Sequence, residues 1–144
     1  MTRNRLFFVT ICGLAGLAGA ASAQTVPLTQ DAYVVPGSAT NSGSATTINA
    51  GGANGAQALV QFDLSTLGIG VTGTNVARAT LTLFAGKVGA TGNFSISVAN
   101  GQWTEATVSG VNSPVAGAAV QSAVPITNGN TYVYVDATAA VQNT

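Results

Sequence analysis

Two tyrosines of the sequence stand where they could form a binding surface. Tyr132 and Tyr134 lie two positions apart, and their alternation with valine predicts a β-strand. Side chains two apart project from the same face of a strand, so both phenols share one face and Val133 and Val135 the other. Aromatic rings stack on the apolar C–H surface of a pyranose, and phenol oxygens hydrogen-bond to its hydroxyls. The pair therefore predicts a carbohydrate-binding platform. The alternative is a solvent-facing or partly covered strand face without a ligand.

A tryptophan is the second candidate for this chemistry. Trp103 lies in the segment QWTEAT and could present its ring to a sugar in the same way. The alternative is structural, because the single tryptophan of a small β-domain commonly packs in the core or at its rim.

Acidic residues and amides offer a candidate calcium site. Such sites combine carboxylates with backbone and amide carbonyl oxygens. Asp31 and Asn41, which begins a short polar loop, are candidate ligands of a structural calcium ion, although the acidic residues are not spaced as in an EF-hand. The structural alternatives are an Asx-turn at Asp31, a strand-end hydrogen bond at Asp63 and a helix cap at Asp136. No other cofactor is expected.

Composition excludes several classes of function. The chain has 144 residues, with four Lys or Arg, four Asp or Glu and no His. Ser-His-Asp catalysis and most zinc sites need histidine, and four basic residues cannot neutralise many phosphates, so no nucleic-acid partner is expected. Four acids alone do not exclude a glycosidase pair, but no motif organises one, and we predict that the chain is not an enzyme. The glycine-rich run 51–55 lacks the lysine of a phosphate-binding loop and is interpreted as a turn.

The first 23 residues have the organisation of a signal peptide. Arg3 and Arg5 precede an apolar run at 6–20, and small residues follow, which predicts cleavage after Ala23. The run is short for a membrane span, so no membrane insertion is expected after cleavage. Cys12, the only cysteine of the sequence, lies within this run, and the mature chain therefore has no disulfide. We expect one secreted domain at 24–144, extracellular or at the cell surface.

Short alternating segments predict an all-β fold. The expected strands are residues 29–35, 59–67, 76–84, 94–98, 120–126 and 131–135, with a further short strand at 46–49 and one helical turn at 136–142. Two sheets are needed to bury two apolar faces, so we expect an antiparallel β-sandwich, jelly-roll-like.

The alternation also predicts which residues are buried and which strands are neighbours. Phe62, Leu81, Leu83 and Ile96 lie on the apolar sides of their strands and are expected in one core between the sheets. The strands 76–84 and 94–98, separated by a turn-like run, are expected to form a hairpin or to be near neighbours.

Six segments together resemble a known family. They are DAYV (31–34), TNSGS (40–44), LVQFDLSTL (59–67), ARATLTLF (77–84), WTEATVS (103–109) and VDATAAVQ (135–142). In this order they resemble the DNRLRE domain family, also described as carbohydrate-binding module family 96, across residues 29–142. The resemblance implies a secreted, non-catalytic β-sandwich, usually an accessory module of polysaccharide-acting enzymes or of bacterial and archaeal surface proteins. The chain departs from the family pattern at Gln61, where an arginine is usual, at Gly110, where a tryptophan is usual, and at its C-terminal end, where the pattern continues with further strands.

Two functions of different classes follow. The first is a module that binds polysaccharide at the cell surface or in the extracellular matrix. The second is a structural surface or matrix subunit that self-associates through β-edges, because an incomplete sheet leaves unpaired backbone groups. The apparent C-terminal truncation favours such an open edge.

Overall fold

The described part of the chain is built almost entirely of strands. The computed structural model describes residues 23–144, and the signal-peptide prediction lies outside the described residues except for Ala23. The strands are β1 (Leu28–Val34), β2 (Gln57–Phe62), β3 (Thr80–Ala85), β4 (Gly92–Asn100), β5 (Val115–Ile126) and β6 (Thr131–Asp136). The helical elements are two 3₁₀ turns, η2 (Leu64–Thr66) and η3 (Gly73–Asn75), and the short helix α2 (Thr138–Gln142). The all-β prediction is confirmed. Within residues 23–144, no helix is long and apolar enough to cross a membrane.

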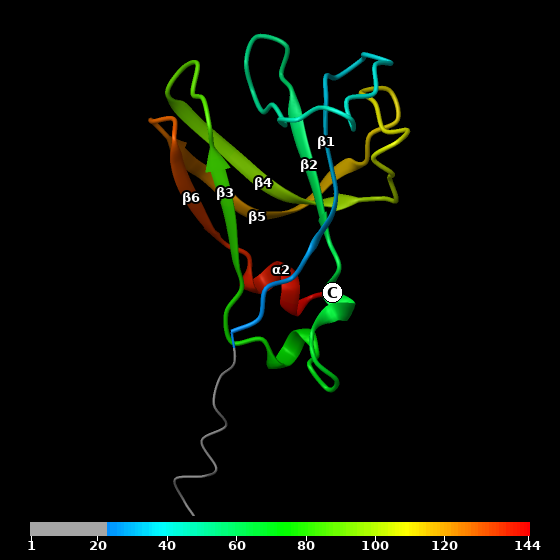
Figure 1. Cartoon of the computed structure of the whole chain (residues 1–144), viewed down its shortest axis with the longest axis vertical. Coiled ribbons are helices and arrows are strands. Elements are labelled where there is room, and N and C mark those ends of the chain that lie inside the picture. Colours follow the sequence, from blue (N-terminus) through cyan, green and yellow to red (C-terminus); the bar gives the residue numbers. More distant parts are fainter. Residues whose placement is uncertain (1–22) are drawn as a thin grey trace, which may run out of the picture.

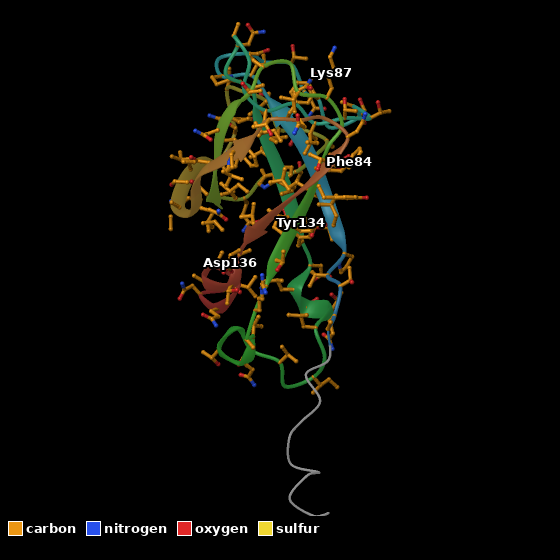
Figure 2. All side chains as sticks on the ribbon, turned by 90° about the vertical axis from the view of Figure 1, so that its left-hand side faces the viewer. Phe84, Lys87, Tyr134 and Asp136 are labelled. Atoms are coloured by element: carbon orange, nitrogen blue, oxygen red, sulfur yellow. The ribbon has the colours of Figure 1, made fainter. Side chains whose placement is uncertain are left out.

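The strands pair into three antiparallel ladders, β1–β2, β3–β6 and β4–β5. The β4–β5 ladder lies to one side of the other two, which gives the molecule two layers (Figures 1 and 2). The predicted hairpin of β3 with β4 is wrong, because β3 pairs with β6. This register places Leu81 opposite Val135 and Leu83 opposite Val133, so the apolar faces of the two strands coincide.

The fully buried core is small. One cluster consists of Ala32, Val34 and Val108, with Leu59 and Trp103 packed against it. Val124 of β5 and Val135 of β6 are also buried, and these two strands contact each other.

The core prediction was partly wrong. Phe62 is 38% exposed, whereas Leu81, Leu83 and Ile96 are half-buried. Leu59 lies opposite Ala32 in the β1–β2 ladder, and residues opposite each other share a face. The face of β2 that packs on the core cluster is therefore that of Leu59, and Phe62 lies on the other face.

The β4–β5 ladder is irregular. Its pairing contains three register shifts, and each places an extra residue on β5, which has 12 residues against 9 in β4. Ala123 of β5 lies in the left-handed region with φ 54°, next to one of these bulges.

The glycine-rich run forms a turn, as predicted. Gly51 and Ala56 form an isolated antiparallel bridge, and Gly51, Gly52 and Gly55 all have positive φ, which glycine adopts without steric cost. The short strand predicted at 46–49 is wrong, since these residues form irregular loop.

Two loops that are far apart in the sequence bind each other. We call residues 35–45 and 101–114 the loop clasp; they lie side by side at the end of the molecule opposite α2 (Figure 1). The Asn41 side-chain amide donates to the Glu105 carbonyl at 2.8 Å and to the Val108 carbonyl at 2.7 Å. The backbone N–H of Gly43 donates to Oδ1 of Asn41 at 3.3 Å. All the hydrogen-bonding groups of this side chain are therefore engaged within the clasp.

Gly110 lies where the two loops of the clasp leave the least room for a side chain. The backbone N–H of Gly37 donates to the Gly110 carbonyl at 3.2 Å. A Cβ atom at position 110 would collide with the backbone carbonyl of Val35. Position 110 therefore has no room for any side chain.

Candidate functional site

The outer face of the β3–β6 ladder exposes three aromatic side chains. Phe84 lies opposite Tyr132, and Thr82 lies opposite Tyr134, so all four residues share one face. Phe84 is 57% exposed, Tyr132 58% and Tyr134 65%. We call these three residues the aromatic face. The prediction that the two tyrosines project from the same face is confirmed.

The three rings form a continuous row. The ring centroids of Phe84 and Tyr132 are 5.1 Å apart with planes at 57°, and those of Tyr132 and Tyr134 are 6.4 Å apart with planes at 31°. Both distances are within the range of interacting aromatic pairs. The three rings therefore form one continuous aromatic surface that spans both strands.

Sequence reasoning missed Phe84 as a site residue. The signal was present, because Phe84 continues the outward positions of Thr80 and Thr82 at a spacing of two. The large hydrophobic side chain was assigned no role, and its place beside Tyr132 depends on the pairing of β3 with β6.

The apolar positions on the inner side fix the orientation of this face. Val135 is completely buried, and Leu81, Leu83 and Val133 are half-buried on the face opposite the tyrosines. A shift of β6 by one residue would expose Val135 and bury both phenols. The aromatic rings are therefore held outward by the packing of the valines and leucines beneath them.

Charged side chains lie at the two ends of the row. Figure 2 shows Lys87, Phe84, Tyr134 and Asp136 in this order along the strand pair. The Asp136 carboxylate accepts a hydrogen bond from the backbone N–H of Thr138 at 2.9 Å. Hydrogen bonds with Thr138 lower the pKa of Asp136 below its usual value; the bond with the Thr138 side chain has the largest effect and the backbone bond the next. The positive charge of Arg78 lowers it further, so the carboxylate is ionised at neutral pH. The bond also confirms a role for Asp136 at the start of α2, although Ala137 is the N-cap residue.

Trp103 lies in a different environment. It is half-buried and packs against the cluster of Ala32, Val34 and Val108. This packing corresponds to the structural alternative for Trp103. Its role in sugar binding stays a prediction.

Protein hydrogen bonds engage the side chain of Asn41 and the backbone of Asp31, the two candidate calcium ligands. The backbone N–H of Asp31 donates to Oε2 of Glu105 at 3.2 Å, and the amide nitrogen of Asn41 faces two carbonyls of the clasp. Among residues 23–144 there is no group of three or more His, Cys, Asp or Glu side chains that could hold a metal ion. The calcium site stays a prediction. Asp63 has the predicted structural role, because its Oδ1 accepts from the backbone N–H of Ser65 at 3.0 Å.

An open depression of about 440 Å³ lies beside the loop clasp. Its lining residues are Gln30, Asn41, Gly43, Ser44, Thr104, Glu105 and Ala106. None of them belongs to β3 or β6, so the depression is separate from the aromatic face. Glu105 brings a carboxylate to it, but this carboxylate already accepts the Asp31 N–H.

Comparison with known proteins agrees with these features. The family model of carbohydrate-binding module family 96 matches residues 22–144, which includes every described residue. No curated protein matches the sequence. Because the family match covers most of the chain, the antiparallel all-β domain with its exposed aromatic row belongs to carbohydrate-binding module family 96.

Proposed function

We propose that this protein is an exported, non-catalytic module that binds polysaccharide through Phe84, Tyr132 and Tyr134. The observation that carries the proposal is a row of three neighbouring aromatic rings exposed on one strand face. Family membership supports carbohydrate as the ligand. The predicted signal peptide supports export to the exterior, where such a module meets its polysaccharide.

Physical chemistry explains why such a row favours a sugar. Large aromatic side chains gain free energy when they leave water, and a contiguous exposed group of them is characteristic of a binding surface. The two phenol hydroxyls, the Thr82 hydroxyl and the Asp136 carboxylate provide hydrogen-bonding groups on the same face. A pyranose matches this combination, because it has an apolar C–H face and a rim of hydroxyl groups.

The proposal is tested by substitution of both tyrosines. We expect the Tyr132→Ala/Tyr134→Ala variant to bind insoluble and soluble polysaccharides about tenfold to a hundredfold more weakly than the unchanged protein, since each lost stacking contact contributes about 1 kcal/mol. Sedimentation with insoluble glycans and affinity electrophoresis in gels that contain soluble ones give the affinities. Circular dichroism verifies that the variant is folded.

The control for this experiment is Ile69→Ala. Ile69 is a large hydrophobic residue that is fully exposed in the segment between η2 and η3, away from the β3–β6 ladder. We expect this variant to bind like the unchanged protein. Equal retention of the double tyrosine variant and the unchanged protein would contradict the proposal.

A second function, self-association through β-edges, is favoured by the pairing of the strands. Each described strand has one ladder partner, so every ladder has two edges. Neither residues 120–126 nor 131–135 contain a lysine, arginine or glutamate that would disfavour pairing with another chain, although Pro125 interrupts the former. Strand addition between copies would satisfy backbone groups at such an edge.

Sedimentation velocity of the purified mature protein tests this second function. If the edges join copies, we expect the average mass to rise with protein concentration. A folded species that stays monomeric at all concentrations would contradict self-association and leave polysaccharide binding as the function.

A further inference from the structure

We infer that the aromatic face binds consecutive sugars in the interior of an extended pyranose chain, and not a single sugar or the end of a chain. The inference rests on the proposed function and specifies the form of polysaccharide that this surface recognises.

The first argument is the length of the row. The three rings are linked by centroid distances of 5.1 Å and 6.4 Å. A strand advances by about 3.4 Å per residue, so the outward side chains from Tyr132 to Asp136 extend over roughly 13 Å. A pyranose is comparable in size to one phenyl ring. The face therefore has room for more than one sugar along the strand.

The second argument is the absence of walls around the rings. The aromatic residues lie on an open strand face, at 57% to 65% exposure. The open depression near the loop clasp is lined by residues of β1 and of two loops, and it does not include the rings. Recognition of a chain end requires groups that surround the terminal sugar, whereas an open strand face lets the chain continue past it in both directions.

The third argument is the position of the polar groups. Thr82 lies opposite Tyr134 and Thr80 lies opposite Asp136 on the same face, while Lys87 follows β3 beyond Phe84 (Figure 2). Hydrogen-bonding groups thus lie beside and beyond the rings along the row. A single sugar stacked on the rings does not contact the outer polar groups. In a longer chain, the sugars on either side of it can reach these groups. From Thr80, which lies opposite Asp136, to Lys87 the chain advances by roughly 24 Å at about 3.4 Å per residue. Affinity is therefore expected to rise with chain length until the sugars cover this span, at about four sugars.

The test begins with one uncharged and one acidic polysaccharide. Affinity electrophoresis in hydroxyethyl cellulose and in sodium alginate shows which type is retained. Isothermal titration calorimetry then uses the matching oligosaccharides, from one to six sugars: the cello-oligosaccharide series for the uncharged chain and the oligouronate series for the acidic one. We expect four sugars to bind at least tenfold more tightly than one, with little further gain up to six. Borohydride reduction of the end of the six-sugar chain should leave its affinity unchanged.

Substitution at one end of the row provides a matched comparison. Phe84→Ala is expected to weaken binding of four sugars by about tenfold and of two sugars less, because it shortens the row, whereas Ile69→Ala should change neither. Equal affinity for one and six sugars, or loss of binding on reduction of the chain end, would overturn this inference. Tyrosine-dependent retention in the same gels would in that case leave the proposed function intact. Failure to retain the protein in either gel would overturn the inference and remove support from the proposed function.

Discussion

Replacement of Gly110 by alanine is expected to lower the free energy of unfolding by about 2 to 4 kcal/mol. The new methyl group would overlap the backbone carbonyl of Val35, and a backbone atom cannot move aside as a flexible side chain can. Relief of the overlap would also separate Gly37 from Gly110 and break their 3.2 Å hydrogen bond. Overpacking costs about 1 to 3 kcal/mol and sometimes more, and the lost hydrogen bond adds about 1 kcal/mol. Urea unfolding followed by circular dichroism measures the change.

Gly89→Ala is the control for this experiment. Gly89 has an ordinary φ, and a Cβ atom there would meet no other atom within 4 Å. We expect its unfolding free energy to stay within about 0.5 kcal/mol of the unchanged protein. Equal unfolding midpoints for the two alanine variants would show that the loops at Val35 and Gly110 are not packed as described.

The second large effect is expected at Asn41. Its side-chain amide joins the Glu105 and Val108 carbonyls, at 2.8 Å and 2.7 Å, and its Oδ1 accepts from Gly43. Asn41→Ala removes these three bonds, and we expect a loss of about 2 kcal/mol in unfolding free energy, because each bond contributes about 0.5 to 1 kcal/mol at this exposed side chain. Asn54→Ala, in the exposed turn at 51–56, is the control and should have little effect.

Thermal unfolding with and without EDTA addresses calcium. Because the amide nitrogen of Asn41 faces the two carbonyls, we expect EDTA to leave the thermal midpoint of the unchanged protein where it is. A midpoint that falls on chelation and returns with added calcium would instead assign a metal to this region. An Asn41→Ala variant as stable as the Asn54→Ala variant would contradict the role of Asn41 in the loop clasp.

The sequence predicted the two faces of β3 and β6 well. Alternation of apolar with polar or aromatic residues is a local property, and it correctly assigned Leu81 and Val135 to the inner side and Tyr132 and Tyr134 to the outer side. The short helix after Asp136 was predicted for the same reason, because its signals lie within a few residues.

The features that were missed depend on contacts between distant residues. Asn41 and Glu105 are 64 positions apart, and no local pattern indicates that their loops meet. The alternation in β3 fits several partner strands equally well, so it could not identify β6, and without β6 the place of Phe84 beside Tyr132 was not predictable. The prediction put Phe62 on the core face because both faces of β2 contain large hydrophobic residues. The core face is that of Leu59, because Leu59 lies opposite Ala32 of β1.

The bulges of β5 limit where another chain could extend the sheet. A new strand can extend a ladder in cross-β fashion only if its backbone groups match an evenly spaced row, and three register shifts interrupt that spacing in the β4–β5 ladder. The β3–β6 ladder, in contrast, pairs without a shift from Thr80 to Ala85. This ladder and the five shift-free pairs of the β1–β2 ladder, from Gln30 to Val34, are the regular templates for a second chain, and both are short. Regular strand addition to a second chain is thereby restricted to short ribbons at these two ladders.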